Sequence, residues 1–242
     1  MKAPLPSNEQ ARLDALRSYD VMDSGAEDQF DDVVRLASLI CEAPIALITL
    51  IDEDRQWFKA RVGLAAPETP REHAFCAHAI LGEETLIVPD ATEDRRFSDN
   101  PLVLGDPNIR FYAGAPLLVP GGHGLGTLCV IDPSPRMNRP LTANQVEALE
   151  ALSRQTVRLL EYRRVSGALA EALATVRTLS PLVPICAWCR KIRDDSAYWS
   201  RIEEYLSANA GVQTTHGICP SCEDDLVSGP AKESSADHME DS

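Results

Sequence analysis

The sequence predicts an α/β fold of the α+β kind, in which helices flank an antiparallel sheet, followed by a long helix and a small metal-stabilised module. Three observations predict this. Apolar strands are joined by hairpins rather than by crossover helices, a helical apolar pattern runs without a break over 142–179, and two Cys-x-x-Cys pairs follow it. With 242 residues, 44% of them hydrophobic, the chain can form one ordinary domain and a smaller module.

Apolar periodicity places the elements of the first domain. Helices are expected over 8–17 and 27–41, and a short one over 75–81. Pro67 and Pro70 predict a loop at 66–75, and a stretch rich in Asp, Asn and Pro predicts another at 89–108. Alternating or continuous apolar runs predict strands at 44–52, 56–62, 86–88, 110–119 and 125–132. Because the longer strands pair as hairpins, the sheet should be antiparallel rather than doubly wound.

A long helix is expected over 142–179, with Thr142 as N-cap and Gln145 at the capping-box position. It would be about 57 Å long at 1.5 Å per residue, more than one small domain needs. From Val165 onward the apolar steps are four, three, four and three residues, which is typical of a coiled-coil seam. We therefore expect the first half to pack on the sheet and the second half to join two chains in a homodimer.

The C-terminal part carries the most specific chemistry of the sequence. Two Cys-x-x-Cys pairs are separated by 29 residues, and an amphipathic helix over 198–209 fills the gap. Four thiolates form the closed tetrahedral shell of a structural Zn²⁺ site, and such sites contribute roughly 10–16 kcal/mol to the folding of small modules. The predicted ligands are Cys186, Cys189, Cys219 and Cys222. His216 is a rival fourth ligand, iron is compatible with the same ligand set, and free thiols or a redox pair remain the alternative.

Charge and hydropathy exclude several classes of partner. The net charge is −14, and no segment offers the basic surface that nucleic acid requires. No apolar run is long enough to span a membrane, and the N-terminus does not look like a signal peptide, so the protein is expected to be cytoplasmic with no membrane partner. Residues 227–242 are polar, small and acidic, and are expected to be disordered.

Several segments of the first domain are more specific than packing requires. In order, they resemble the GAF domains of bacterial signalling proteins, which stand ahead of histidine kinases and diguanylate cyclases. The segments are Gln56–Leu64, Glu68–Arg71, Phe75–Ile80, Val88–Phe97, Asn100–Val103, Ile109–Leu117 and Leu125–Asp132. The resemblance covers residues 8–165. Separately, residues 180–226 resemble a zinc-ribbon-like extension of some bacterial sensor proteins.

The GAF resemblance implies a six-stranded antiparallel sheet with a ligand pocket on one face, closed by the loops at 66–75 and 89–108. Trp57, Phe75 and Phe111 would form its apolar wall. The polar lining would be His78, Asp90, Asp94, Arg96, Arg110 and Tyr112. Simpler roles stay open, because aspartates in loops usually cap turns and a histidine on an apolar face usually belongs to the core. The ligand is not identified by the resemblance.

The order of the parts predicts a non-catalytic sensory protein of bacterial signal transduction. The GAF domain would sense a small ligand or partner and relay the change through a dimeric helix to the zinc module, with a kinase or cyclase as output protein in trans. One alternative is a thiol-based GAF enzyme of the free methionine sulfoxide reductase type that uses Cys76 or Cys129, and another is a zinc–thiolate redox switch. Buried structural cysteine is the simpler interpretation of Cys41, Cys76 and Cys129. GAF relatives that bind a bilin attach this pigment at a Cys-His dipeptide. Here Ala77 separates Cys76 from His78, so pigment attachment is not expected.

Overall fold

The computed structural model describes residues 2–179, 184–193, 199–210, 215 and 217–228. The chain divides into two compact units, Met1–Ala172 and Leu173–Ser242. Among the described helices, none is both long enough and apolar enough to span a membrane.

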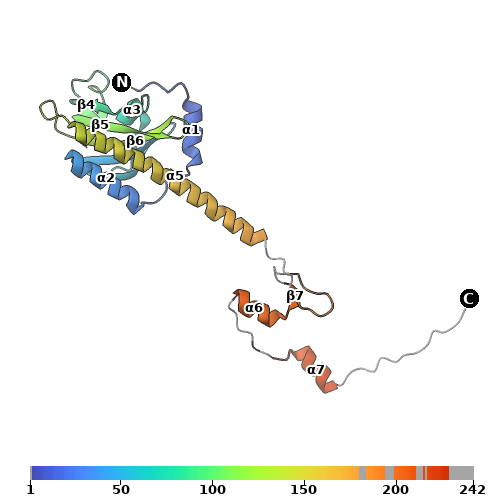
Figure 1. The fold of residues 1–242 in the computed structure, drawn as a ribbon. Helices are drawn as coiled ribbons and strands as arrows, with labels where there is room; N and C mark the ends of the chain where they lie inside the picture. Colours follow the sequence, from blue (N-terminus) through green and yellow to red (C-terminus); the bar gives the residue numbers. More distant parts are fainter. Residues whose placement is uncertain (1, 180–183, 194–198, 211–214, 216, 229–242) are drawn as a thin grey trace, which may run out of the picture. The chain divides into compact units, whose positions relative to one another are not determined.

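The first unit is built on a six-stranded antiparallel sheet with the strand order β3-β2-β1-β6-β5-β4 (Figure 1). The hairpins β1–β2 and β5–β6 form as expected, and β1 pairs with β6 at the centre. The strands are β1 Ile45–Ile51, β2 Arg55–Val62, β3 Glu68–Pro70, β4 Leu86–Val88, β5 Phe111–Val119 and β6 His123–Asp132. The expected α+β fold is thereby confirmed.

Both segments expected to be loops contain short regular elements. Strand β3 was not predicted from the sequence. It has only three residues of alternating exposure, too few to form a recognisable periodic pattern. A 3₁₀ turn over Arg71–His73 and the short helix α3, Phe75–Ala79, follow it. In the second loop, α4 spans Pro101–Leu104. Asn100 is its N-cap, and the Asn100 side chain accepts a hydrogen bond from the Leu102 N–H at 2.9 Å.

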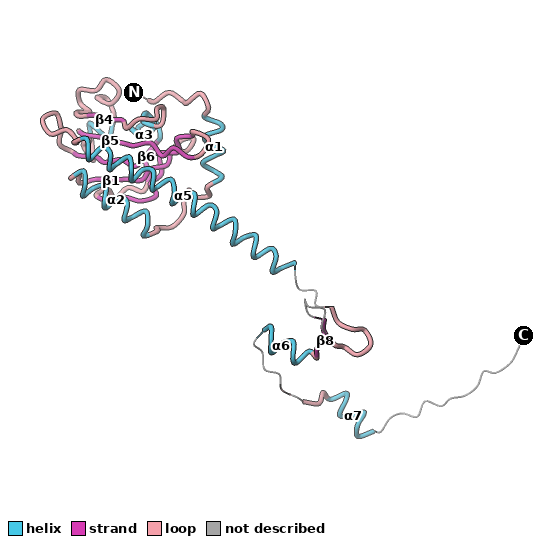
Figure 2. The backbone as a smooth tube through the Cα atoms, in the orientation of Figure 1, coloured by secondary structure: helices cyan, strands magenta, loops and turns pink. Residues whose placement is uncertain are grey.

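The two faces of the sheet carry separate apolar cores. One face packs against α1, Glu9–Ser18, α2, Asp28–Cys41, and the first part of α5, Ala143–Leu179 (Figure 2). The other packs against α3, α4 and the long connection around Phe97. Strand β1 serves both faces by simple alternation, because its even-numbered apolar residues lie in the first core and its odd-numbered ones in the second.

A bulge in β2 changes this alternation. Ile48 lies opposite Ala60 and Thr49 lies opposite Phe58, so Lys59 is an extra residue on β2. Phe58 and Ala60 therefore lie in opposite cores although they are two residues apart. The Lys59 side chain is fully buried.

Helix α5 begins with the predicted capping box. The Gln145 side chain accepts a hydrogen bond from the Thr142 N–H at 2.9 Å, and the Gln145 N–H donates to the Thr142 hydroxyl at 3.3 Å. Leu149 and Leu160 are buried in the helix-side core. Farther along, Tyr162, Val165 and Leu169 are exposed. The side chains of 176–179, which complete the predicted seam, lie outside the described residues.

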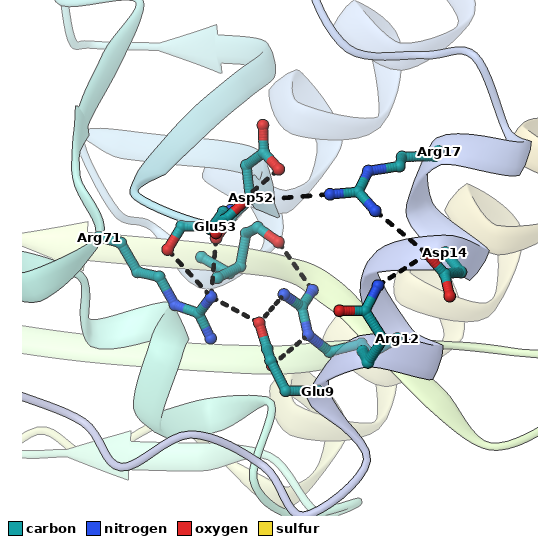
Figure 3. A network of polar contacts seen from close by, with 9 residues as sticks. Glu9, Arg12, Asp14, Arg17, Asp52, Glu53 and Arg71 are labelled. Carbon is teal, nitrogen blue, oxygen red and sulfur yellow. Dashed lines mark hydrogen bonds and ion pairs between the residues drawn. The ribbon is translucent and has the colours of Figure 1, made fainter.

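A buried polar network fixes α1 to the sheet (Figure 3). Arg12, only 1% exposed, donates to the Ile51 carbonyl at 2.7 Å and binds Glu9. Arg71 reaches the same Glu9 carboxylate at 2.6 Å and the Asp52 carbonyl at 2.8 Å. Burial raises the pKa of Glu9, but the hydrogen bonds from the two arginines outweigh it and lower the pKa to about 2. The network thus joins α1, the β1–β2 turn and the segment directly after β3.

The second unit contains a two-stranded hairpin, β7 Ile192–Arg193 with β8 Trp199–Ser200, and the helices α6, Ile202–Ala210, and α7, Pro220–Ser228. The helix expected over 198–209 begins later, because Trp199 and Ser200 pair with β7. Helix α7 was not predicted and takes in the first two residues assigned to the acidic tail. The rest of that tail, 229–242, and His216 lie outside the described residues.

Candidate functional site

A cavity of about 100 Å³ lies on the sheet face opposite α2 and α5. Both segments expected to close a pocket contribute to it: Ala66 and Thr69 from the first, Leu102 and Asp106 from the second. Its polar lining residues are Gln56, Thr69, Cys76, Asp106 and Tyr112. Most of the remaining wall is apolar: Ile45, Leu47, Phe58, Leu64, Phe75, Leu102, Pro107, Ile109 and Ile131.

Gln56 is the unusual residue of this wall. It lies on β2 opposite Thr69 of β3, is 5% exposed, and donates from Nε2 to the Thr69 hydroxyl at 3.1 Å. Its Oε1 is buried and accepts no hydrogen bond from any described residue. Leaving a buried acceptor unsatisfied costs about 1–3 kcal/mol, and because Gln56 is a lining residue, its Oε1 is suited to a hydrogen-bond donor of a bound molecule.

A buried polar cluster forms another part of the same face. The Cys76 and Cys129 sulfurs lie 3.8 Å apart, and the Tyr112 hydroxyl donates to the Cys76 sulfur at 3.3 Å. Beside them, the hydroxyls of Thr49 and Thr127 lie 3.1 Å apart. All five side chains are at most 2% exposed.

The strand residue two positions after Tyr112 makes room for this hydroxyl. A Cβ on Gly114 would lie 2.1 Å from the Tyr112 oxygen, so no side chain fits there unless the tyrosine ring moves. Gly114 thereby allows the ring to lie along β5 with its hydroxyl at Cys76.

The two cysteines of the cluster are not equivalent. Burial raises the pKa of Cys76, but hydrogen bonding with Cys129, the two threonines and Tyr112 outweighs it and lowers the pKa to about 7. Burial and the neighbouring Cys76 raise the pKa of Cys129 well above its ordinary value. Of the two, Cys76 is therefore the thiol that ionises more readily.

Of the residues predicted to line a pocket, the structure places two at the cavity, Phe75 and Tyr112. Trp57 and Phe111 instead lie in the helix-side core, so their placement in the apolar wall was wrong. The residues that line the cavity are their neighbours on the same strands, Gln56, Phe58 and Tyr112. Successive strand residues point to opposite faces of the sheet, so Trp57 and Phe111 face away from the cavity that their neighbours line.

The charged residues predicted for the pocket make local contacts. Asp90 accepts from the Thr92 N–H at 2.9 Å and from its hydroxyl at 2.7 Å, which is a turn-capping role. Asp94 and Arg96 pair with each other at 2.6 Å. Arg110 donates to the Val103 carbonyl at 2.8 Å. The structure does not bring these four to the cavity.

His78 lies at the edge of the same core. Its ring meets the Phe97 ring edge-on, with the centroids 4.9 Å apart, and Phe97 stacks on Phe75 at 3.9 Å. His78 is therefore one ring removed from the cavity wall.

Sequence reasoning missed Gln56 and Thr69. A glutamine that interrupts the apolar side of a half-buried strand was the available signal for the first. The second lies in the Glu68–Arg71 segment of the GAF resemblance, but β3 was not recognised there, so nothing in the sequence placed Thr69 opposite Gln56.

The predicted metal ligands lie in the second unit. Cys186 and Cys189 share a tight turn in which the Cys189 N–H donates to the Cys186 sulfur at 3.4 Å and the Arg190 N–H donates to the Cys186 carbonyl at 3.0 Å. Backbone N–H groups of Cys189 and Trp188 lower the pKa of Cys186. Cys219 and Cys222 lie at the start of α7. Within the described ranges, no three His, Cys, Asp or Glu side chains are gathered as metal ligands would be, so the zinc site stays a prediction.

Comparison with known proteins agrees with the architecture of the first unit. The GAF domain family model matches residues 25–160. A cyclic di-GMP phosphodiesterase of Pseudomonas aeruginosa is 46% identical over 151 residues, which are 62% of this chain and 25% of that protein. The match therefore spans about a quarter of that relative's length.

Solved structures resemble the first unit at low sequence identity. The GAF domain of a phosphoenolpyruvate-protein phosphotransferase from Coxiella burnetii is 18% identical, with a TM-score of 0.49, and covers 67% of this chain and 99% of that one. A type II free methionine-R-sulfoxide reductase from Thermoplasma acidophilum is 11% identical, with a TM-score of 0.46, and covers 56% of this chain and 92% of that one. The family model spans more than half of the chain and the whole six-stranded sheet, and the chain belongs to the GAF domain family.

Proposed function

We propose that this chain is a non-catalytic sensory module of signal transduction, whose GAF domain binds a small uncharged ligand in the cavity beside Gln56. The observation that carries the proposal is the unsatisfied Oε1 of Gln56 in an otherwise mainly apolar wall. A ligand with an apolar body and one N–H or O–H group would satisfy this atom and fill the cavity.

The size of the cavity limits the ligand. A cavity of about 150 Å³ with an apolar lining binds benzene, so about 100 Å³ suits a molecule of no more than one ring. Apart from the ionisable thiol of Cys76, Asp106 is the one charged residue of the wall, and it is exposed. An anionic ligand would therefore find no buried counter-charge among the lining residues.

The contacts of β2 support a route from the cavity to α5. Phe58 lines the cavity, and Lys59, the next residue, lies on the helix side of the sheet. The Lys59 ammonium donates to Glu27 at 2.6 Å, and Arg163 of α5 donates to the same oxygen at 3.0 Å. A shift of β2 on ligand binding would reach α5 through these charged contacts.

The exposed apolar residues of α5 support the predicted homodimer. Tyr162, Val165 and Leu169 are 59–68% exposed and recur at three and four residues. Burying such a stripe against a second copy of the helix would remove apolar surface from water. The relative from Pseudomonas aeruginosa, named a phosphodiesterase of cyclic di-GMP, supports an output enzyme of cyclic di-GMP turnover alongside the kinase or cyclase expected from the sequence.

We further propose that the four cysteines of the second unit bind structural Zn²⁺. The turn at Cys186 and Cys189 supports this, because its backbone N–H groups stabilise a thiolate. Arg190, Lys191 and Arg193 follow directly and would offset the negative charge of a four-thiolate site.

Native mass spectrometry of the full chain, purified without added metal or ligand, tests the parts of this proposal in one spectrum. The expected result is a dimer with one zinc per chain and a bound small molecule that is absent from Gln56→Leu. The Gln10→Leu variant is the matched control, because Gln10 is exposed on α1 and its side chain donates to Asp14 one turn along the same helix. Loss of the bound mass in Gln10→Leu, or its retention in Gln56→Leu, would rule out the role of Gln56.

A further inference from the structure

We propose that Cys76 and Cys129 are a reactive dithiol that reduces a small hydroperoxide and closes to an intramolecular disulfide. The sulfurs lie 3.8 Å apart in the reduced protein, on α3 and on β6. A disulfide requires about 2.05 Å, so the two atoms must approach by about 1.8 Å. Helix α3 has only five residues and is followed by a loop, and a small shift of this helix toward β6 would bring the two sulfurs together.

The surroundings of the pair differ from those of a packing cysteine. The Tyr112 hydroxyl donates to the Cys76 sulfur, and two further hydroxyls lie beside it. Cys41 provides the contrast within the same domain. It lies in the apolar helix-side core, and burial raises its pKa. A thiolate is the nucleophile in thiol chemistry. Cys76, whose pKa is lowered, is therefore more reactive than Cys41 or Cys129, whose pKa values are raised.

The cavity supplies the route for the oxidant. Cys76 is part of its wall, whereas Cys129 is not among the lining residues. A molecule of hydrogen peroxide is smaller than the cavity and would meet Cys76 first. This order assigns Cys76 as the attacking thiol and Cys129 as the resolving thiol.

The reaction proceeds in two balanced steps. The Cys76 thiolate attacks the terminal oxygen of the hydroperoxide, the S–O bond forms as the O–O bond breaks, and the alkoxide takes a proton and leaves as the alcohol, or as water from hydrogen peroxide. Cys129 then loses its proton and attacks the sulfenic sulfur of Cys76. The S–S bond forms, the S–O bond breaks, and the hydroxide leaves with the proton as water. Two thiols are oxidised and one hydroperoxide is reduced.

Peptide mapping of the full-length wild-type chain tests the inference without any substitution. Reduced protein is treated with hydrogen peroxide at a few equivalents, denatured in N-ethylmaleimide, digested and analysed by mass spectrometry. The expected product is a peptide pair linked between Cys76 and Cys129, with Cys41 alkylated. Recovery of Cys76 and Cys129 in alkylated form, under conditions that oxidise Cys186 and Cys189, would overturn the inference. So would sulfinic acid on Cys76 without a link.

Two variants separate reactivity from folding. In Cys129→Ser the resolving sulfur is gone but a hydroxyl remains, so dimedone should trap a sulfenic acid on Cys76. In Cys41→Ser the link should form as in the wild type. Thermal unfolding followed by circular dichroism checks that each variant is folded. A folded Cys129→Ser protein without dimedone label contradicts the assignment of Cys76, and the wild-type map decides the question if that variant does not fold.

Discussion

Arg163 of α5 donates its Nε hydrogen to Glu27 Oε1 at 3.0 Å, across 136 positions of the sequence. The same oxygen accepts from the fully buried Lys59 ammonium at 2.6 Å. Glu27 therefore holds together the strand that lines the cavity and the helix that leaves the domain. Removing one partner of a buried ion pair leaves the other charge uncompensated, which is far more costly than losing a surface pair.

Replacing Glu27 by glutamine should reduce the free energy of unfolding of the first unit by about 3 kcal/mol, because Lys59 stays buried with only neutral acceptors. The matched control is Asp32→Asn on α2, whose partner Arg35 is exposed at 66%. That change should cost less than about 0.5 kcal/mol. Urea denaturation followed by circular dichroism measures both, and equal losses in the two variants would disprove the special role of Glu27.

The Glu9 network predicts a specific pH dependence. The pKa of Glu9 is lowered from 4.5 to about 2 in the folded protein, so its stabilisation is present above pH 4.5 and is lost as the pH falls toward 2. Glu9→Gln should be less stable than the wild type by about 2 kcal/mol at pH 7, and this difference should shrink between pH 4.5 and pH 2. Urea titrations at several pH values measure it. A difference that is constant over this range would contradict the prediction.

The polar cluster predicts the titration of a buried thiol. The rate of alkylation of Cys76 by iodoacetamide should rise with a midpoint near pH 7, whereas that of Cys41 should rise only above its ordinary pKa. Tyr112→Phe removes a hydrogen bond to the thiolate and should move the Cys76 midpoint upward. Mass spectrometry of quenched samples gives both rates. Parallel profiles for the two cysteines would show that the cluster does not activate Cys76.

The exposed apolar stripe of α5, formed by Tyr162, Val165 and Leu169, predicts that a carboxylate introduced in the stripe disrupts the dimer and one introduced beside it does not. Leu169→Glu should convert the dimer to a monomer at micromolar concentration, because a carboxylate would be buried in the seam. Ala170→Glu lies one residue away on the exposed surface of the same helix and should leave the dimer intact. Sedimentation velocity distinguishes the two, and a wild-type monomer would end the proposal.

The long strands and the α+β class were predictable because they depend on local periodicity over seven or more residues, and the α5 capping box was predictable because it is a motif of four consecutive residues. It did not reveal β3, whose three residues gain their strand geometry from pairing with β2. The cavity residues were mostly missed for a related reason. Contacts across the sheet decide which side chains of β2 face the cavity. The bulge at Lys59, which changes their alternation, depends on pairing with β1 rather than on the sequence of β2 alone.

The predicted acids and bases of the pocket illustrate a second limit. Asp90, Asp94 and Arg96 satisfy one another or adjacent backbone within a few residues, as loop side chains commonly do. Their motif is specific, but motif spacing does not say whether a side chain points toward a cavity or back to its own turn.

Thermal unfolding of the full chain in the presence of phenol and of toluene tests the central claim most directly. Both probes have one apolar ring, and only phenol has a donor for Gln56 Oε1. Phenol should raise the melting temperature of the wild type and lose most of this effect in Gln56→Leu, whereas toluene should act equally on both. Equal stabilisation of the wild type and Gln56→Leu by phenol, or none of either, would contradict a ligand site at Gln56.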